Sequence, residues 1–423
     1  MAILAINGGE KYRKEPFPHW PIIEEEEKKA ALDVLNSAEL STFLTSPGEY
    51  FLGGKKIKEF EKLFCDYFNT RYAVAMNSAT ACLHAAVVAC DIKPGDEVLV
   101  TPYSFTSSAT CVLMNNAVPI FVDVCEDDFC IDPKKLEEKI TQKTKAIIVV
   151  HLFGGSAKMD EIMDITRKHN LKVIEDCAQT IGATYKDKLL GTIGDCGIFS
   201  LIENKNITSG GEGGMFITNN DKIAEIARLI RNHGEAIISN QPRQYNSSIL
   251  GWNYRMIELG AAIGIEQFKK LDKFNNERIK LSEYLSKRIE EEIPGIKPCL
   301  NNDKGKNVYY VLAFKYNEDK VEIPRDLFIK ALNAEGIPFG AGYVRPLYLA
   351  PIYHENKHFA IEHFGKYVNY DKGICPVAER LHEKEIILTM MCRPPATLND
   401  MDDIVNAMKK IIDNKEELLK YNL

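Results

Sequence analysis

The middle of the chain, from about residue 70 to residue 235, alternates short apolar runs of strand character with runs of helical spacing. The strand-like runs are EVLVTP, PIFVDV, KAIIVVHLF, KVIEDCA, CGIFSL and GMFITNN. Their apolar residues are nearly continuous, as is typical of strands buried on both faces of a parallel sheet. The intervening runs, such as TACLHAAVVAC and KMDEIMDITRKHN, carry apolar residues at helical intervals. This alternation predicts the α/β class, with a mostly parallel sheet between helices.

The rest of the chain predicts a second, smaller domain. Residues 256–292 have a helical pattern throughout, and a strand, VYYVLAF, and a helix from Pro324 to Glu335 follow them. A final helix begins after ATLND, with its N-cap expected at Asn399 or Asp400. We therefore predict an N-terminal segment packing near the small domain (1–44), a large domain (45–255), a connecting helix (256–292) and a small α+β domain (293–423).

Composition and charge exclude several classes of protein. The 423 residues include 60 acidic and 53 basic ones, for a formal net charge of -7, so we expect no nucleic-acid or anionic-membrane partner. The start, MAILAINGGEKYRKEP, has no signal-peptide pattern, and no run of about twenty apolar residues could span a bilayer. We therefore expect a cytoplasmic protein. The 11 cysteines form no C-x-x-C pair and none has zinc-site spacing to a histidine, so we expect neither disulfides nor a metal site.

Lys205 stands in the stretch SLIENKNITSGGEGG, between two predicted strands. A lysine in a loop is most often a solvated surface charge. Here, however, Ser200 brings a hydroxyl to the end of the preceding strand, and the glycines of GGEGG permit a sharp turn or a close approach of backbone to a ligand. These neighbours make Lys205 a candidate for chemistry.

Asp176 and Gln179 follow the strongly apolar strand in VIEDCAQTIGA. In open α/β sheets, ligands bind beyond the carboxyl ends of the strands. An acid at that edge could simply cap the next helix. Pyridoxal phosphate, however, needs a carboxylate beside its ring nitrogen and a lysine for the Schiff base, and Asp176 and Lys205 would supply that pair.

Two further runs place polar and aromatic groups at the same edge. Asn77, Ser78 and Thr80 stand where a helix begins, so N–H groups, hydroxyls and the helix dipole could hold the cofactor phosphate, although Ser and Thr there are usually only caps. Phe105 follows another predicted strand and could stack on a planar ring, although an aromatic at a strand end is more often core. Because these features occur in order after strands of one sheet, they favour a single cofactor site.

The sequence resembles the fold-type-I pyridoxal-phosphate aminotransferases that act on keto-sugars and cyclitols, the DegT/DnrJ/StrS family. The similarity covers nearly the whole chain and is carried by LAINGG, PFPHWP, NSATACLHAA, PGDEVLVTPYSF, VHLFGGSAKMDEI, VIEDCAQTIGATY, FSLIENKNITSGGEGG, GWNYRMIELGAAIGIEQ and CPVAERL. The resemblance implies a large-domain sheet of the seven-stranded type and pyridoxal 5'-phosphate as cofactor. It also implies amino transfer from glutamate or glutamine to a keto-sugar, preferably nucleotide-linked, or to a keto-cyclitol in amino-sugar biosynthesis.

The same resemblance assigns roles to individual residues. Lys205 would form the Schiff base, Asp176 would partner the pyridinium nitrogen, Gln179 would contact the ring hydroxyl and Phe105 would stack on the ring. Asn253, in GWNYRM, matches an asparagine that reaches the phosphate in the neighbouring subunit, which implies a homodimer with active sites at the subunit interface. The residues implied for the phosphate of the same subunit are Ser78, Ala79, Thr80 and Ser200.

Three alternative functions are considered. A sugar-dehydratase branch of the family has histidine at the lysine position, whereas this chain keeps Lys205, which favours aminotransfer. A pyridoxal-phosphate-binding regulatory subunit with little activity would have an impaired lysine or acid, and both are intact. A nicotinamide-dependent dehydrogenase lacks support because no G-x-G-x-x-G follows the first strand and GGEGG precedes a strand.

The sequence gives the least information on which residues bind the acceptor. Tyr343 and Arg345 in GAGYVRPLY, and Arg243 in QPRQYNSS, are candidates for binding a phosphate or carboxylate of the substrate, because arginine binds such groups in bidentate fashion. Surface arginines in ordinary ion pairs are at least as good an interpretation. Tyr310 and Tyr348 stand where relatives often have histidine, and both are expected towards the substrate pocket.

Overall fold

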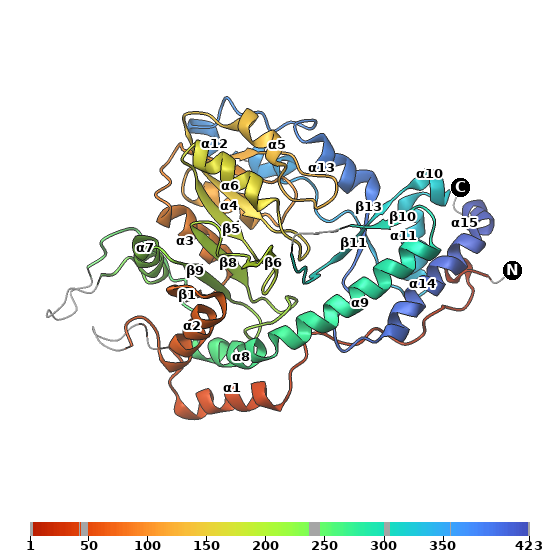
Figure 1. Ribbon diagram of the computed structural model, residues 1–423, viewed down its shortest axis with the longest axis horizontal. Helices are drawn as coiled ribbons and strands as arrows, with labels where there is room; N and C mark the ends of the chain where they lie inside the picture. The colour runs from red at the N-terminus through yellow and green to blue at the C-terminus, as the bar shows by residue number, and fades with distance from the viewer. Residues whose placement is uncertain are drawn as a thin grey trace.

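The computed structural model describes residues 3–41, 43, 50–236, 246–299, 305–355 and 357–421. Two groups of secondary structure, each built on its own sheet, are joined by the long helix α9 (Leu271–Glu292), which runs from the larger group to the smaller one (Figure 1). Among the described residues, no helix is both long enough and apolar enough to cross a membrane.

Within the described residues the larger sheet has seven strands, in the order β1-β9-β8-β5-β4-β2-β3. Strand β9 is antiparallel to both of its neighbours, and the other pairings are parallel. The strands are almost wholly buried, as their continuous apolar runs predict, so the predicted α/β class with a mostly parallel sheet is confirmed. The bounds are β1 Tyr72–Met76, β2 Glu97–Val100, β3 Val118–Phe121, β4 Thr144–Val150, β5 Lys172–Asp176, β8 Cys196–Ser200 and β9 Gly214–Thr218.

Among the helices that accompany this sheet, α2 buries one apolar stripe, whereas α3 is buried on nearly all sides. In α2 the stripe consists of Ile57, Phe60, Phe64 and Phe68, which recur every three or four residues. Helix α3 packs against α4 and α7, whereas α2 packs against α8. The bounds are α2 Lys55–Phe68, α3 Ala79–Ala89, α4 Ser107–Met114, α5 Pro133–Leu136, α6 Met159–Lys168, α7 Asp221–Arg231 and α8 Glu258–Lys269, and a short hairpin is formed by β6 Thr184–Tyr185 and β7 Lys188–Leu189.

The smaller sheet is antiparallel, in the order β10-β11-β13-β12. A second hydrophobic cluster, separate from the main core, joins this sheet to α9, α11 and α14. The bounds are β10 Ile296–Pro298, β11 Leu312–Tyr316, β12 Gly340–Ala341, β13 Ile386–Thr389, α10 Glu318–Val321, α11 Arg325–Ala334, α12 Phe359–His363, α13 Pro376–Arg380, α14 Leu398–Asp413 and α15 Lys415–Tyr421.

Two local predictions need correction. The stretch predicted as one connecting helix contains two, because the Lys270 N–H bonds to Gln267 O and ends α8 before α9 begins. The N-cap of α14 is Thr397 rather than Asn399 or Asp400. The Asp400 carboxylate accepts a hydrogen bond from the Thr397 N–H (2.6 Å), which completes a capping box.

The N-terminal segment crosses from one group of elements to the other. Leu4 is fully buried in the second cluster, and Arg13 forms a salt bridge with Asp400 of α14 (2.7 Å). Farther along, α1 (Glu25–Ser37) packs against α8. The division of the chain into four parts stays a prediction.

Candidate active site

The parallel strands of the larger sheet end at one common edge. Asp176 is the last residue of β5 and Ser200 the last of β8, and these strands are parallel neighbours. Gly214, the first residue of β9, pairs with Ser200 on one side and with Met76, the last residue of β1, on the other. This register brings the loop after β8, the end of β5 and the start of α3 together.

Lys205 is fixed by its backbone in the loop after β8. Its N–H donates to Ile202 O (3.0 Å), and its carbonyl accepts a hydrogen bond from Trp20 Nε1 (3.0 Å). The side-chain amine lies 3.9 Å from the centre of the Tyr310 ring. Burial lowers the pKa of Lys205 to about 8, against the opposing effect of the Asp176 charge. The amine is therefore neutral, and nucleophilic, at a lower pH than a surface lysine.

Asp176 is 3% exposed, and its carboxylate accepts hydrogen bonds from Ser108 Oγ (2.8 Å) and from the Ala178 N–H (3.1 Å). Burial raises the pKa of Asp176, and those two hydrogen bonds and the charge of Lys205 oppose this rise. Because turns rather than a helix follow β5, Asp176 is not a helix cap. The carboxylate is held in one position and interacts electrostatically with Lys205.

Glu175 anchors the same strand end to a neighbouring loop. Its carboxylate accepts three backbone N–H groups of the 191–194 loop, at 2.6–2.8 Å. His151 Nδ1 accepts the Ala157 N–H (3.1 Å), so Nε2 carries the proton and donates to Glu175 (3.1 Å). The ligand atoms of His151, Glu175 and Cys177 are close enough to hold a metal ion. The carboxylate and the imidazole are already engaged in these hydrogen bonds, which favours a structural role.

Gln179 connects the sheet edge to the segment that follows β12. Its Oε1 accepts the Phe153 N–H (2.7 Å), and its Nε2 donates to Tyr343 Oη (2.9 Å). The Tyr343 N–H donates to Tyr103 Oη (3.0 Å). The structure therefore brings Tyr343, a predicted substrate residue, into contact with Gln179, a predicted cofactor residue.

The start of α3 combines a side-chain cap with a close backbone approach. Ser78 Oγ accepts the Ala81 N–H (3.1 Å), so the capping alternative holds for this hydroxyl. A Cβ on Gly214 would come within 2.5 Å of the Ser78 carbonyl carbon and 2.6 Å of Ala79 N, so β9 must begin with glycine. The first turn of α3, with Thr80, lies at the same edge as Ser200 and offers N–H groups to an anion.

Phe105 and Asn253 are both exposed in the single chain. Phe105, after β2, is 59% exposed, which rules out the interpretation as a core aromatic and leaves its ring accessible. Asn253 forms a β-bridge with Asn232, and its carbonyl accepts a hydrogen bond from Asn77 Nδ2 (3.3 Å). The segment that carries Asn253 is thus fixed beside the start of α3.

The predicted substrate residues have different locations. Arg345 is exposed, and its charge acts on the imidazole of His382. Arg243 lies outside the described residues. The expectation that Tyr348 faces the substrate pocket is wrong, because its side chain is fully buried and its hydroxyl donates to Glu379.

The sequence pattern does not mark several residues that surround Lys205. Ser108 holds Asp176, and Trp20 donates to the Lys205 carbonyl. The Arg278 guanidinium lies 4.6 Å from the centre of the Trp20 ring. The motif PFPHWP contains Trp20 and supports the family resemblance without indicating a role, whereas a serine or an arginine within a helix gives no signal at all.

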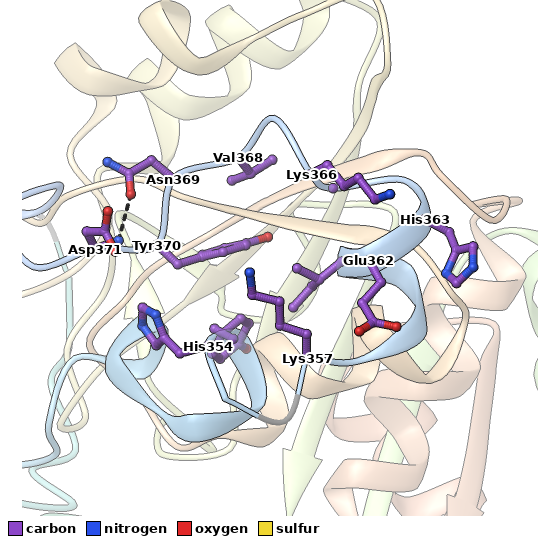
Figure 2. A pocket seen from close by; sticks show the side chains of 12 residues that line it. His354, Lys357, Glu362, His363, Lys366, Val368, Asn369, Tyr370 and Asp371 are labelled. Carbon is purple, nitrogen blue, oxygen red and sulfur yellow. Dashed lines mark hydrogen bonds between the residues drawn. The ribbon is translucent and has the colours of Figure 1, made fainter.

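A polar pocket of about 710 Å³, lined by side chains of the segment Tyr353–Asp371, lies at another part of the molecule (Figure 2). Figure 2 shows Lys357 pointing into it. Tyr370 donates to Pro119 O (2.9 Å) in β3, the end strand of the sheet, and three strands separate β3 from β8, which leads to Lys205. This pocket therefore does not belong to the site around Lys205.

Comparison with known proteins decides the family. The model of the DegT/DnrJ/EryC1/StrS aminotransferase family matches residues 23–409. The chain belongs to this family. It is therefore a pyridoxal-phosphate-dependent aminotransferase of fold type I, and the alternative of a nicotinamide-dependent dehydrogenase is excluded.

Individual proteins are similar to this chain over most of their lengths. The chain is 39% identical over 300 residues to GDP-perosamine synthase of Caulobacter vibrioides, covering 71% of this chain and 79% of that protein. It is 31% identical over 425 residues to a putative L-glutamine:3-amino-2,3-dideoxy-scyllo-inosose aminotransferase of Micromonospora echinospora, covering 99% of each. Among solved structures, the aminotransferase from Psychrobacter cryohalolentis has a TM-score of 0.83 at 30% identity, covering 94% of this chain and 99% of that one.

The residues at this sheet edge fit the cofactor of the family. Lys205 offers an amine with a lowered pKa, and Asp176 offers a fixed, buried carboxylate. Phe105 presents an exposed aromatic ring, and the first turn of α3 offers backbone N–H groups to a phosphate. Each chemical part of pyridoxal phosphate therefore has a group of matching chemistry at one edge.

Proposed function

We propose that this aminotransferase moves an amino group from glutamate or glutamine to a keto-sugar, preferably nucleotide-linked, or to a keto-cyclitol, in amino-sugar biosynthesis. The observation that carries the proposal is the buried pair of Lys205 and Asp176 at the carboxyl edge of the sheet. Support for the substrates comes from the names of two similar proteins, a GDP-perosamine synthase and a putative L-glutamine-dependent inosose aminotransferase.

Lys205 is the residue that would bond covalently to the cofactor and transfer the proton. Bound pyridoxal phosphate supplies an aldehyde that takes up the amino group and a ring that accepts an electron pair. Lys205 would hold the cofactor through Nζ and, when its amine is free, would take the proton from the donor α-carbon. A pKa of about 8 suits both roles, because the amine must be neutral to attack and to accept a proton.

The other predicted residues would hold the cofactor in place. Asp176 would keep a proton on the ring nitrogen, Gln179 would contact the ring hydroxyl and Phe105 would stack on the ring face. Ser108 keeps the Asp176 carboxylate oriented through its 2.8 Å hydrogen bond. The phosphate would be bound by Ser78, Ala79, Thr80 and Ser200.

We also propose a cytoplasmic homodimer with shared active sites. Asn253 is exposed in the single chain, and its backbone is fixed beside Asn77 at the start of α3. In the dimer, its side chain would reach the cofactor phosphate of the neighbouring subunit.

Tyr343 is the best supported of the acceptor-binding candidates, since its hydroxyl lies 2.9 Å from Gln179 Nε2. Arg345 and Arg243 stay predictions as phosphate or carboxylate ligands. The two alternative functions within the fold, a sugar dehydratase and a regulatory subunit of low activity, are disfavoured by the intact Lys205 and Asp176.

One experiment tests the centre of the proposal. The purified protein is loaded with pyridoxal phosphate, reduced with borohydride, and digested to locate the labelled peptide by mass spectrometry. A second sample is mixed with glutamate or glutamine, and loss of the visible cofactor band is followed. We expect the label on Lys205 and bleaching by at least one donor. A label on another residue, or none, would show that Lys205 is not the attachment site.

A further inference from the structure

Arg278, in α9, is a buried arginine without a neutralising acid among the described residues. It is 1% exposed, and its Nε and Nη2 form no hydrogen bond there. The fully buried Arg231, by contrast, has an acidic partner. It donates hydrogen bonds to the Glu61 carboxylate (2.6 Å) and to backbone carbonyls. Leaving a buried cation unpaired is costly, which points to an anion that arrives from outside the chain.

A second arginine stands close to the first. Arg393 follows β13, is partly buried, and has an Nε without a hydrogen-bond partner among the described residues. The charge of Arg393 adds to burial in lowering the pKa of Arg278, so the two guanidinium groups repel each other in the structure as it stands. An anion between them would remove that repulsion.

Three observations connect this arginine pair with the surroundings of Lys205. The Arg278 guanidinium lies over the Trp20 ring, whose Nε1 donates to the Lys205 carbonyl. Both guanidinium charges lower the pKa of Tyr310 against the effect of burial, and the Tyr310 ring lies 3.9 Å from Lys205 Nζ.

The third observation is a hydrogen bond made by α9 itself. Asn275, one turn before Arg278, accepts a hydrogen bond at Oδ1 from Asn206 Nδ2 (2.8 Å), and Asn206 directly follows Lys205. The same face of α9 therefore carries Arg278 and the residue that holds the loop of Lys205.

We propose that Arg278 and Arg393 bind the α-carboxylate of the amino donor. This inference rests on the proposed function, because only an amino-acid donor has a carboxylate on the carbon whose proton Lys205 removes. That carboxylate must lie one bond from the reacting carbon, and therefore within a few ångströms of the Lys205 amine. Guanidinium groups bind carboxylates through paired hydrogen bonds, which also fixes the orientation of the donor.

The test uses the half-reaction, because it needs no acceptor. Wild-type holoenzyme, Arg393→Gln, Arg393→Lys and Arg278→Gln are mixed with increasing L-glutamate and L-glutamine, and the rate of cofactor bleaching is recorded. Binding of glutarate, which has carboxylates but no amine, is measured by calorimetry on the same proteins. Arg393→Gln is the main variant because Arg393 is only partly buried. Arg288→Gln, in the same helix α9 but paired with Glu292 and Asp402, is the matched control.

In Arg393→Gln, we expect the half-saturating donor concentration and the glutarate Kd to rise on the order of tenfold or more. The limiting rate should change little, Arg393→Lys should recover part of the affinity, and Arg288→Gln should behave as wild type. Unchanged donor and glutarate affinity in Arg393→Gln would overturn the inference. Binding of inorganic pyrophosphate, a stand-in for a nucleotide-linked acceptor, is measured in parallel. If Arg393→Gln lost affinity for pyrophosphate alone, that result would also overturn the inference. A loaded wild-type enzyme that binds glutarate but reacts with no donor would instead overturn the proposed function.

Discussion

At the scale of single residues, Lys205 and Asp176 set each other's protonation. Burial lowers the pKa of Lys205, and the Asp176 charge limits that decrease. Burial also raises the pKa of Asp176, and the Lys205 charge limits that increase. The cofactor-free protein therefore holds an amine that becomes neutral near physiological pH, beside a carboxylate that favours a cationic partner.

The first prediction concerns the pH dependence of cofactor attachment. Only the neutral amine of Lys205 attacks the aldehyde, so the attachment rate should rise with pH and level off above about 8. In Asp176→Asn the midpoint should move to lower pH, because the charge that raises the pKa of Lys205 is gone. Stopped-flow absorbance over a pH series measures both profiles. A wild-type rate that keeps rising to 10.5, the ordinary pKa of lysine, would contradict this prediction.

Ser108 should act as a positioning residue for Asp176. Ser108→Ala removes a hydrogen bond to the carboxylate, so we expect the donor half-reaction to slow about tenfold, with little change in donor affinity. Because this hydrogen bond lowers the pKa of Asp176, the acid limb of the rate profile should move to higher pH in the variant. Thr110→Ala, in the same helix, removes a bond to the Thr106 carbonyl instead and should leave that limb in place. Identical acid limbs in wild type and Ser108→Ala would show that the serine has only a packing role.

At the scale of elements, the sequence predicts what local patterns determine. Near-continuous apolar runs identify the buried parallel strands, and the residues that follow them reach one edge because parallel strands end together. Local patterns do not determine where a helix begins. At the start of α14, Thr397, Asn399 and Asp400 are all acceptable N-caps. Only the hydrogen bond from the Thr397 N–H to Asp400 selects Thr397.

The start of β9 provides an element-scale prediction. In Gly214→Ala the new Cβ would meet backbone atoms of Ser78 and Ala79 at 2.5–2.6 Å, so β9 and α3 must move apart. We expect a loss of about 1 to 3 kcal/mol in the free energy of unfolding and weaker binding of pyridoxal phosphate. Gly340→Ala is the matched control, since its Cβ would meet only the Leu388 side chain at 3.5 Å. Urea denaturation and equilibrium dialysis of the cofactor measure the two effects, and equal behaviour of the two variants would refute the close-approach explanation.

At the scale of the whole molecule, the site depends on contacts that no local pattern reveals. Gln179 and Tyr343 are hydrogen-bonded across 164 positions, and Trp20 reaches Lys205 across 185. Arg278 gives no signal in the sequence, because its lack of an acidic partner among the described residues is a property of the folded surroundings and not of its neighbours in the chain. The sequence therefore predicts the lysine, the acid and their strands, whereas the residues around them emerge only from the packing of distant segments.

The last prediction tests whether two chains share each active site. If Asn253 serves the neighbouring subunit, a heterodimer of Lys205→Ala and Asn253→Ala has one site with both residues intact and one with neither. When the two variants are mixed under conditions of subunit exchange, about half of the dimers should be mixed, and each of these has one intact site out of two. The amplitude of donor-driven bleaching should therefore reach about one quarter of the wild-type amplitude. The assay uses a cofactor concentration at which Asn253→Ala alone is largely unloaded. Sites confined to single chains would each keep one defect, so mixing would restore nothing, and that result would exclude the shared site.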